Sequence, residues 1–248
     1  MTSQAEPGTP ARIGRRSSPR THHWWRWALV SVAALVAVAV AAVALFIKLQ
    51  PVPPPLALPT AHASAPSGPL DGSWDAGPGS VAGFRVRETA LGFSNDVVGR
   101  TRAVTGTMVI SGEQVTRALF RIGLATVTVD GKTQPQFAAS LDTRAHPVAS
   151  FTLTHPVTLA PGFASGAAIR ITATGQLSMR GNAHRVTVTI SCRRDGPGLQ
   201  IAGSFPVAFA GWGIKDPAGF GPFGSLADHG LAEFRVVLHR AAHQPAAA

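Results

Sequence analysis

Few residues in this chain have the types and spacings that catalysis or phosphate binding needs. The run GFGPFG at 219–224 fits the letters G-x-G-x-x-G, but Pro222 lies inside it and no helix is expected after it, so no helix N-terminus awaits a phosphate. Ser80 in GPGSVAG misses the G-x-S-x-G nucleophile pattern by one position. We therefore interpret the first motif as a glycine-rich loop and predict no serine nucleophile.

The histidines, acids and cysteine are equally sparse. Apart from His22-His23, the histidines lie singly, without the close spacings of zinc sites, so we expect no metal and no cofactor. No obvious pair of catalytic carboxylates occurs among the scattered acids, although Asp142, for which a turn-capping role is favoured, and Glu233 are worth following. Cys192 is the only cysteine, which excludes an internal disulfide, and we expect it to be a small buried residue. The sequence thus does not indicate an enzyme.

Regularly spaced apolar side chains are what the chain offers instead. Residues 169–179, IRITATGQLSM, alternate apolar or glycine positions with polar ones, which is typical of a half-buried β-strand. The same period of two recurs at 84–87, 118–124, 186–190, 199–209 and 234–239, and more weakly at 103–110, 126–130 and 148–154. Turn signals separate the segments at RGNAH (180–184), RRDGPG (193–198) and LAPGFASG (159–166), so about eight antiparallel strands are expected.

The apolar face of these strands must be buried against another part of the protein. No stretch after residue 47 has a sustained period of 3.6, so no long amphipathic helix is available to pack on the sheet. The sheet must therefore pack on a second sheet or close on itself. A closed eight-stranded barrel is either filled by its side chains or holds one small ligand, and periodicity leaves both possibilities open.

The N-terminal region has a different character. Residues 28–47 are twenty residues without a charge, apolar except for Ser31 and about 30 Å long as a helix, which predicts a transmembrane span. Five arginines precede the span and only Lys48 follows it, so residues 1–27 are predicted to be a disordered, basic, cytoplasmic tail and the remainder extracytoplasmic. Part of the net charge of +10 thus comes from arginines that set the orientation of the span in the membrane, and nucleic-acid binding is not indicated.

The rest of the chain divides into three parts. Residues 48–70, with PVPPP and SAPSGP, are expected to be a proline-rich spacer between membrane and domain, 71–241 one folded domain, and 242–248 a flexible end. A cleaved secretory signal is the alternative to the anchor, because Ala61-His62-Ala63 has the small-x-small pattern of a cleavage site. The apolar stretch is long for a signal peptide and ends well before Ala61, which favours the anchor.

Four segments of the domain, in order, resemble the YceI-like family of polyisoprenoid-binding domains. They are VVGRTRAVTGTMVISG (97–112), SLDTRAHPVASFTLTHPVTL (140–159), ATGQLSMRGNAHRVTVTI (173–190), and GSFPVAFAGWGIKDP through HGLAEFRVVL (203–238). The resemblance covers roughly residues 72–240 and implies a lipocalin-like antiparallel barrel whose apolar tunnel accepts an isoprenoid chain, as in polyprenyl phosphates or quinones. The family's Arg-Asp pair before the Leu-Asp element is absent from GKTQPQFAAS (131–140).

The expected function is therefore that of a membrane-anchored, extracytoplasmic binding protein with an isoprenoid lipid in its barrel. The residues predicted to line the barrel interior are Phe84, Val86, Phe120, Ile122, Leu124, Phe151, Leu153, Ile171, Leu177, Met179, Val188, Phe205, Val207, Phe209, Trp212, Phe234 and Val236. A phosphate head group would meet basic residues near loops, for which the candidates are Arg100, Arg102, Lys132 and Arg180. The alternative is a scaffold without ligand, in which Phe84, Phe120, Phe151, Phe205 and Phe209 fill the interior.

Overall fold

The computed structural model describes residues 22–49, 52–60, 64–90, 92–215 and 224–242. The chain divides into two compact units, Met1–Leu49 and Gln50–Ala248, which are considered separately. The first unit contains one helix, α1 (His22–Leu49). No helix within the described residues is long and apolar enough to cross a membrane.

The second unit is built of strands. They are β1 (Gly72–Ala76), β2 (Val81–Ala90), β3 (Phe93–Thr101), β4 (Val104–Ser111), β5 (Gln114–Gly123), β6 (Thr128–Val129), β7 (Val148–Leu153), β8 (Val157–Thr158), β9 (Ile169–Met179), β10 (Asn182–Asp195), β11 (Gly198–Ala208) and β12 (Gly224–Arg240). A short helix, α2 (Pro135–Ser140), and two single turns of 3₁₀ helix, η1 (Leu124–Thr126) and η2 (Phe209–Trp212), interrupt them.

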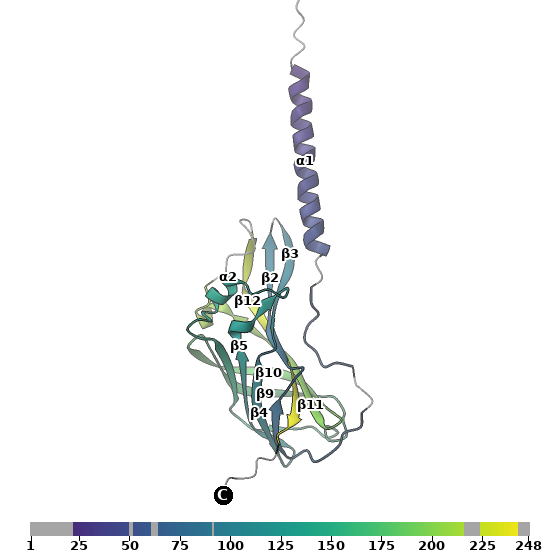
Figure 1. The fold of residues 1–248 in the computed structure, drawn as a ribbon, viewed down its shortest axis with the longest axis vertical. Helices are drawn as coiled ribbons and strands as arrows, with labels where there is room; N and C mark the ends of the chain where they lie inside the picture. The colour runs from purple at the N-terminus through teal and green to yellow at the C-terminus, as the bar shows by residue number, and fades with distance from the viewer. Residues whose placement is uncertain (1–21, 50–51, 61–63, 91, 216–223, 243–248) are drawn as a thin grey trace, which may run out of the picture. The chain divides into compact units, whose positions relative to one another are not determined.

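The sheet closes into a barrel of eight strands. Its hydrogen-bonded ring runs β1-β4-β5-β7-β9-β10-β11-β12 and closes where β12 pairs with β1, with every pairing antiparallel. The C-terminal end of β12 pairs with β1, and the rest of the same edge of β12 pairs with β2, which in turn pairs with β3. β2 and β3 therefore extend the wall beyond the ring, at the end where α2 lies (Figure 1). The predicted all-β class and eight-stranded antiparallel barrel are confirmed.

Local sequence explains the tight hairpins of this barrel. Between β9 and β10, Arg180 and Gly181 have positive φ values of 55° and 75°, and between β10 and β11 Gly196 has φ 55°. Such left-handed conformations suit two-residue connections between antiparallel strands, and glycine adopts them without steric cost. Strand β9, which contains the alternating residues 169–179, turns its apolar face to the barrel interior, where Ala173 and Leu177 are buried.

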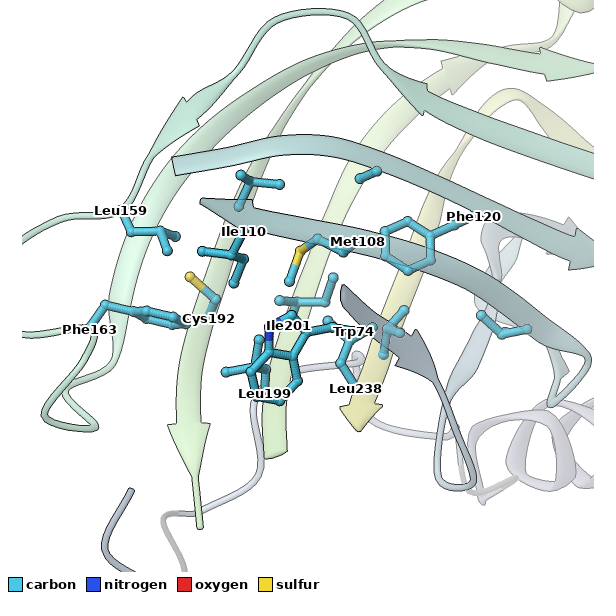
Figure 2. Packing of buried hydrophobic residues seen from close by; sticks show 14 of the residues in the cluster. Trp74, Met108, Ile110, Phe120, Leu159, Phe163, Cys192, Leu199, Ile201 and Leu238 are labelled. Atoms are coloured by element: carbon cyan, nitrogen blue, oxygen red, sulfur yellow. The ribbon is translucent and has the colours of Figure 1, made fainter. Parts of the chain in front are cut away.

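The end of the barrel away from α2 is closely packed. Trp74, Leu199 and Leu238 are at most 1% exposed, and the Trp74 indole donates a hydrogen bond to the Leu70 carbonyl at 2.9 Å. Figure 2 shows these side chains converging with Ile110 and Cys192 from facing strands. Cys192 is 2% exposed, as predicted, and its burial raises the pKa of its thiol to about 12. We call this region the packed end.

The proline-rich segment is bound to the barrel. The Pro53 and Pro54 carbonyls accept hydrogen bonds from Arg85 at 2.7 Å and Arg100 at 3.0 Å, and the Pro59 carbonyl accepts one from Arg193 at 2.9 Å. Further along, Arg194 donates to the carbonyls of 67 and 68, and Arg240 to those of 69 and 71. The described linker residues therefore form a strap on the barrel, in contrast to the spacer that their composition predicted.

Candidate functional site

A cavity of about 200 Å³ lies inside the barrel, towards the end where α2 lies. Its wall is almost wholly apolar: among the described lining residues, only Ser140 and Glu233 have polar side chains. A second, smaller cavity of about 50 Å³ lies towards the packed end, and Phe120, Phe151, Ile190 and Ile201 line both. The interior is therefore hollow at one end and nearly closed at the other. We call the end with the larger cavity the hollow end.

Most of the residues that the sequence predicted for the interior are placed around these cavities. Leu153 and Ile171 line the smaller cavity, and Trp212 lines neither. The other fourteen line the larger one: Phe84, Val86, Phe120, Ile122, Leu124, Phe151, Leu177, Met179, Val188, Phe205, Val207, Phe209, Phe234 and Val236. Their contact with a ligand stays a prediction.

Trp212 has a structural position instead. It is 5% exposed and packs against Phe209 and Ile214 beside the larger cavity, with the His184 ring edge-on at 4.5 Å. Its carbonyl accepts a hydrogen bond from Asn182 at 3.2 Å. Trp212 therefore ties η2 to the β9–β10 hairpin and does not face the cavity.

Several lining residues escaped sequence reasoning. Phe137 and Leu141 come from α2 and the residue after it, a segment that had too few residues to show a helical period. Pro135 at the first position of α2 was a possible signal, because proline is favoured there. Phe137 is 7% exposed and its ring lies 5.2 Å from that of Phe84, so α2 covers the hollow end of the barrel.

Glycines explain why an aromatic-rich barrel stays hollow. A Cβ atom on Gly99 would lie 2.4 Å from the Phe84 ring, and one on Gly175 would lie 2.3 Å from the Phe151 ring. A Cβ atom on Gly106 would lie 2.6 Å from the Phe120 ring, and one on Gly203 would lie 2.8 Å from the Phe234 ring. Each ring thus lies against the wall over a glycine on a neighbouring strand, where any other residue would push it inwards.

Glu233 belongs to the outer face of this wall. It alternates on β12 with Phe234, which faces the cavity, so its side chain points the other way. Its carboxylate, 2% exposed, pairs with Arg85 at 2.9 Å and Arg100 at 2.8 Å, the two arginines that hold the strap. Burial is the largest cause of the shift in the pKa of Arg100 and lowers it, whereas the negative charge of Glu233 acts to raise it. This buried cluster fixes the strap and leaves the cavity without charge.

The four basic residues predicted for a head group are dispersed. Arg100 is engaged by Glu233 and the Pro54 carbonyl, and Arg180 donates to the Gly213 carbonyl beside η2. Arg102 and Lys132 are exposed, and none of the four lines either cavity. The structure thus gathers no cationic site from them, and Arg100 in particular has a structural role.

The remaining candidates show no chemistry of their own. Asp142 follows α2 with φ 49°, and its carbonyl accepts hydrogen bonds from the amides of Ala145 and His146, so it lies in a turn as expected. The motif at 219–224 lies, except for Gly224, outside the described residues, as do the tails at 1–21 and 243–248. Within the described part of the chain, no three His, Cys, Asp or Glu residues are placed to hold a metal ion.

A closed antiparallel barrel with an apolar cavity inside it is typical of the lipocalin-like fold. The model of the YceI-like domain matches residues 74–237, and the chain belongs to that family. No curated protein matches the chain.

Solved structures similar to this chain have low sequence identity to it, and the fold is shared with the first of those that follow. A polyisoprenoid-binding domain from Saccharophagus degradans is 12% identical, with a TM-score of 0.52 over 69% of this chain and 99% of that one. BcnA from Burkholderia cenocepacia is 17% identical, with a TM-score of 0.46 over 62% and 95%. The YceI protein of Campylobacter jejuni is 11% identical, with a TM-score of 0.39 over 51% and 75%.

Proposed function

We propose that the protein binds an isoprenoid-type lipid, such as a polyprenyl phosphate or an isoprenoid quinone, inside its barrel. The observation that carries the proposal is the cavity of about 200 Å³ with its almost wholly apolar wall. Membership of the YceI-like family supports an apolar lipid, and the Saccharophagus degradans domain with the same fold is described as polyisoprenoid-binding. A scaffold without ligand would need the five phenylalanines named above to fill the interior, whereas all five line open space.

The size of the cavity limits how much of the tail it holds. A 150 Å³ apolar cavity accepts benzene, so by proportion this one holds roughly eight carbon atoms, or between one and two isoprene units. Their burial would contribute about 6 kcal/mol before the costs of association. A longer tail requires Phe120 and Phe151 to move and open the smaller cavity, or it leaves the barrel at the hollow end.

The head group should remain outside the cavity. No charged side chain of the described wall points into the cavity, and a buried charge without a partner costs several kcal/mol. A phosphate would therefore stay near α2, where water can reach it, and so would the neutral quinone ring, whose carbonyl oxygens find few donors in the apolar wall. This makes the tail the main source of affinity and the head group a secondary one.

We further propose that residues 28–47 anchor the protein in a membrane, with the barrel on the extracytoplasmic side. Twenty uncharged residues, apolar except for Ser31 and preceded by five arginines, support this orientation. A lipid with low water solubility would then be taken up and released close to the bilayer. Such a protein holds or carries its ligand, and no catalytic step is proposed.

Ligand binding can be tested on the full chain in detergent. After delipidation, prenyl alcohols of two, three and more isoprene units are titrated, with straight-chain alcohols of equal carbon number as controls, and bound lipid is identified by mass spectrometry. We expect saturable binding of the prenyl alcohols, and Val188→Phe, which fills the larger cavity, to weaken it roughly tenfold or more. Thr187→Phe, which points outwards on the same strand, is the matched control. Equal binding by both variants would contradict the proposed site.

The anchor needs a separate test. The mass of the mature N-terminus should include residues 28–47, and a start at Ser64 would establish the cleaved signal instead. In a Cys192→Ala background, a cysteine placed at the exposed Arg144 should react on intact cells with a maleimide that does not cross membranes. Labelling only after lysis would contradict the extracytoplasmic orientation.

A further inference from the structure

One wall of the barrel has an unusual outer surface. It consists of the outward residues of β5, β7 and β9, and of β10 as far as Ser191, all neighbours in the closed ring. Beyond Ser191, β10 continues with Arg193, which donates to the Pro59 carbonyl, and with Asp195. Threonine dominates the wall, at 152, 172, 174, 187 and 189 and, directly after β7, at 154. The other outward positions carry arginine, serine, glutamine, glycine, one leucine, one valine and one alanine. None carries aspartate, glutamate or lysine. We call this surface the threonine–arginine wall.

Strand register places these side chains in rows across the wall. One row joins Arg121, Ser150 and Ser178, and the next joins Leu119, Thr152, Gln176 and Arg185. A third brings Thr174 opposite Thr187, with their hydroxyls 3.2 Å apart. Neighbours lie about 4.8 Å apart across strands and about 6.7 Å apart along them, so hydroxyl and guanidinium groups form a regular lattice.

The arginines of this wall are free. Arg117, Arg121, Arg170 and Arg185 are exposed, and within the described residues no hydrogen bond or ion pair engages their side chains. By contrast, Arg85 and Arg100 on β2 and β3 are occupied by acids and strap carbonyls, and Arg193 near the end of β10 is occupied by the Pro59 carbonyl. The positive charge of the threonine–arginine wall is therefore uncompensated by protein groups.

We propose that the threonine–arginine wall binds an acidic polysaccharide, a linear hydroxylated chain with repeated carboxylate or phosphate groups. Guanidinium groups bind such anions in bidentate geometry, and threonine hydroxyls donate to and accept from sugar hydroxyls. Arg117 and Arg121 lie about 13 Å apart along β5, and β10 lies about 14 Å away across the wall, so several repeats of a flexible chain contact it at once. The site is independent of the lipid cavity, which opens on the other face of the same strands.

Other polyanions fit this wall less well. A membrane surface is bound by lysine and arginine together with aromatic or aliphatic side chains that insert, and this wall offers only Leu119 and Val148 as large exposed apolar residues, with no aromatic ring among its described side chains. Single-stranded nucleic acid needs stacking aromatics, which the wall lacks, and duplex DNA presents a rigid convex surface to a barrel that is itself convex. A flexible polysaccharide can follow the curvature.

Binding of soluble polygalacturonate to the full chain in detergent tests the proposal, with neutral dextran as the uncharged comparison. We expect saturable binding that weakens with added salt, and the combined Arg117→Gln, Arg121→Gln, Arg170→Gln and Arg185→Gln variant to bind roughly tenfold or more weakly. The matched control removes the same charge elsewhere, through Arg102→Gln, Lys132→Gln, Arg144→Gln and Lys215→Gln. Equal loss in both variants would show attraction by net charge alone and would overturn the proposal.

The hydroxyl groups are tested separately. Thr152→Val, Thr174→Val and Thr187→Val together keep the strand-forming shape but remove three hydroxyls. We expect roughly threefold weaker binding of polygalacturonate and unchanged binding of inorganic polyphosphate. Unchanged binding of both, or tighter binding to phosphatidylglycerol vesicles or to a DNA duplex than to polygalacturonate, would overturn the assignment to a polysaccharide. Because none of these substitutions faces the interior, prenyl-alcohol binding should be retained whatever the outcome.

Discussion

The two ends of the barrel are built from the same strands and the same kinds of side chain, yet one is packed and the other is hollow. At the packed end Trp74, Leu199 and Leu238 converge with 1% exposure or less. At the hollow end Phe84, Phe151 and other rings lie over glycines on neighbouring strands and leave about 200 Å³ free. Aromatic content alone therefore does not decide whether a barrel is filled, because the residue beneath each ring decides where the ring points.

The largest expected loss of stability follows from truncating a side chain at the packed end. Trp74→Ala removes a ring that is 1% exposed, together with its hydrogen bond to Leu70, and should lower the free energy of unfolding by about 3–5 kcal/mol. Phe205→Ala at the hollow end should cost less than half as much, because that ring already borders empty space. Urea denaturation measures both, and equal losses would contradict the distinction between the ends.

A smaller effect should follow from giving one glycine a side chain. Gly99→Ala places a methyl group 2.4 Å from the Phe84 ring, so the ring must turn into the cavity, at a cost of about 1–3 kcal/mol in stability. Prenyl-alcohol affinity should fall at the same time. Gly211→Ala is the control, since its Cβ would meet no atom within 4 Å. Retained affinity in Gly99→Ala would show that the glycine does not hold the cavity open.

The boundary between the cavities offers a test of ligand length. Phe120→Leu keeps an apolar side chain where the cavities meet and should cost less than about 1.5 kcal/mol in stability. Because it opens a passage towards the smaller cavity, the preference for longer prenyl alcohols over shorter ones should increase. Isothermal titration with a length series measures this, and an unchanged preference would mean that tails do not pass Phe120.

The smallest effect concerns pH at the packed end. Burial raises the pKa of the Cys192 thiol from 9.0 to about 12, so between these values the unfolded chain loses the proton and the folded chain keeps it. The stabilisation is complete below pH 9 and declines as pH rises towards 12, by about 1 kcal/mol near pH 10. Cys192→Ala should lack this alkaline loss in parallel denaturation curves. Rapid thiol labelling of the folded protein at pH 8 would contradict the burial.

Much of this architecture was accessible from the residues. Alternation in segments such as IRITATGQLSM, and the turn residues between them, predicted the strands and their antiparallel pairing, because a period of two has one structural meaning. The same alternation placed fourteen residues on the wall of the larger cavity. It failed for Trp212, which follows the last residue of β11 by four positions and lies beyond the strand geometry that the pattern assumes.

Other features depended on partners far away in the chain. The role of α2 as a cover was hidden because six residues carry too little periodicity, and the strap was hidden because proline-rich composition is typical of a spacer. What binds the strap is a set of arginines more than 30 residues later, whose buried carboxylate partner Glu233 comes later still. Such contacts have no local signal.

The sequence by itself determined that this chain forms antiparallel strands and which side chains in the alternating segments avoid water, since these follow from the spacing of residues along the backbone. It predicted about eight strands, whereas the described structure has twelve, because short segments such as β1 and β8 carry too little alternation. Only the tertiary structure decided that the interior is hollow at one end and packed at the other. Empty space depends on which ring lies over which glycine across a strand pair, and that is a property of register and closure between residues distant in the chain.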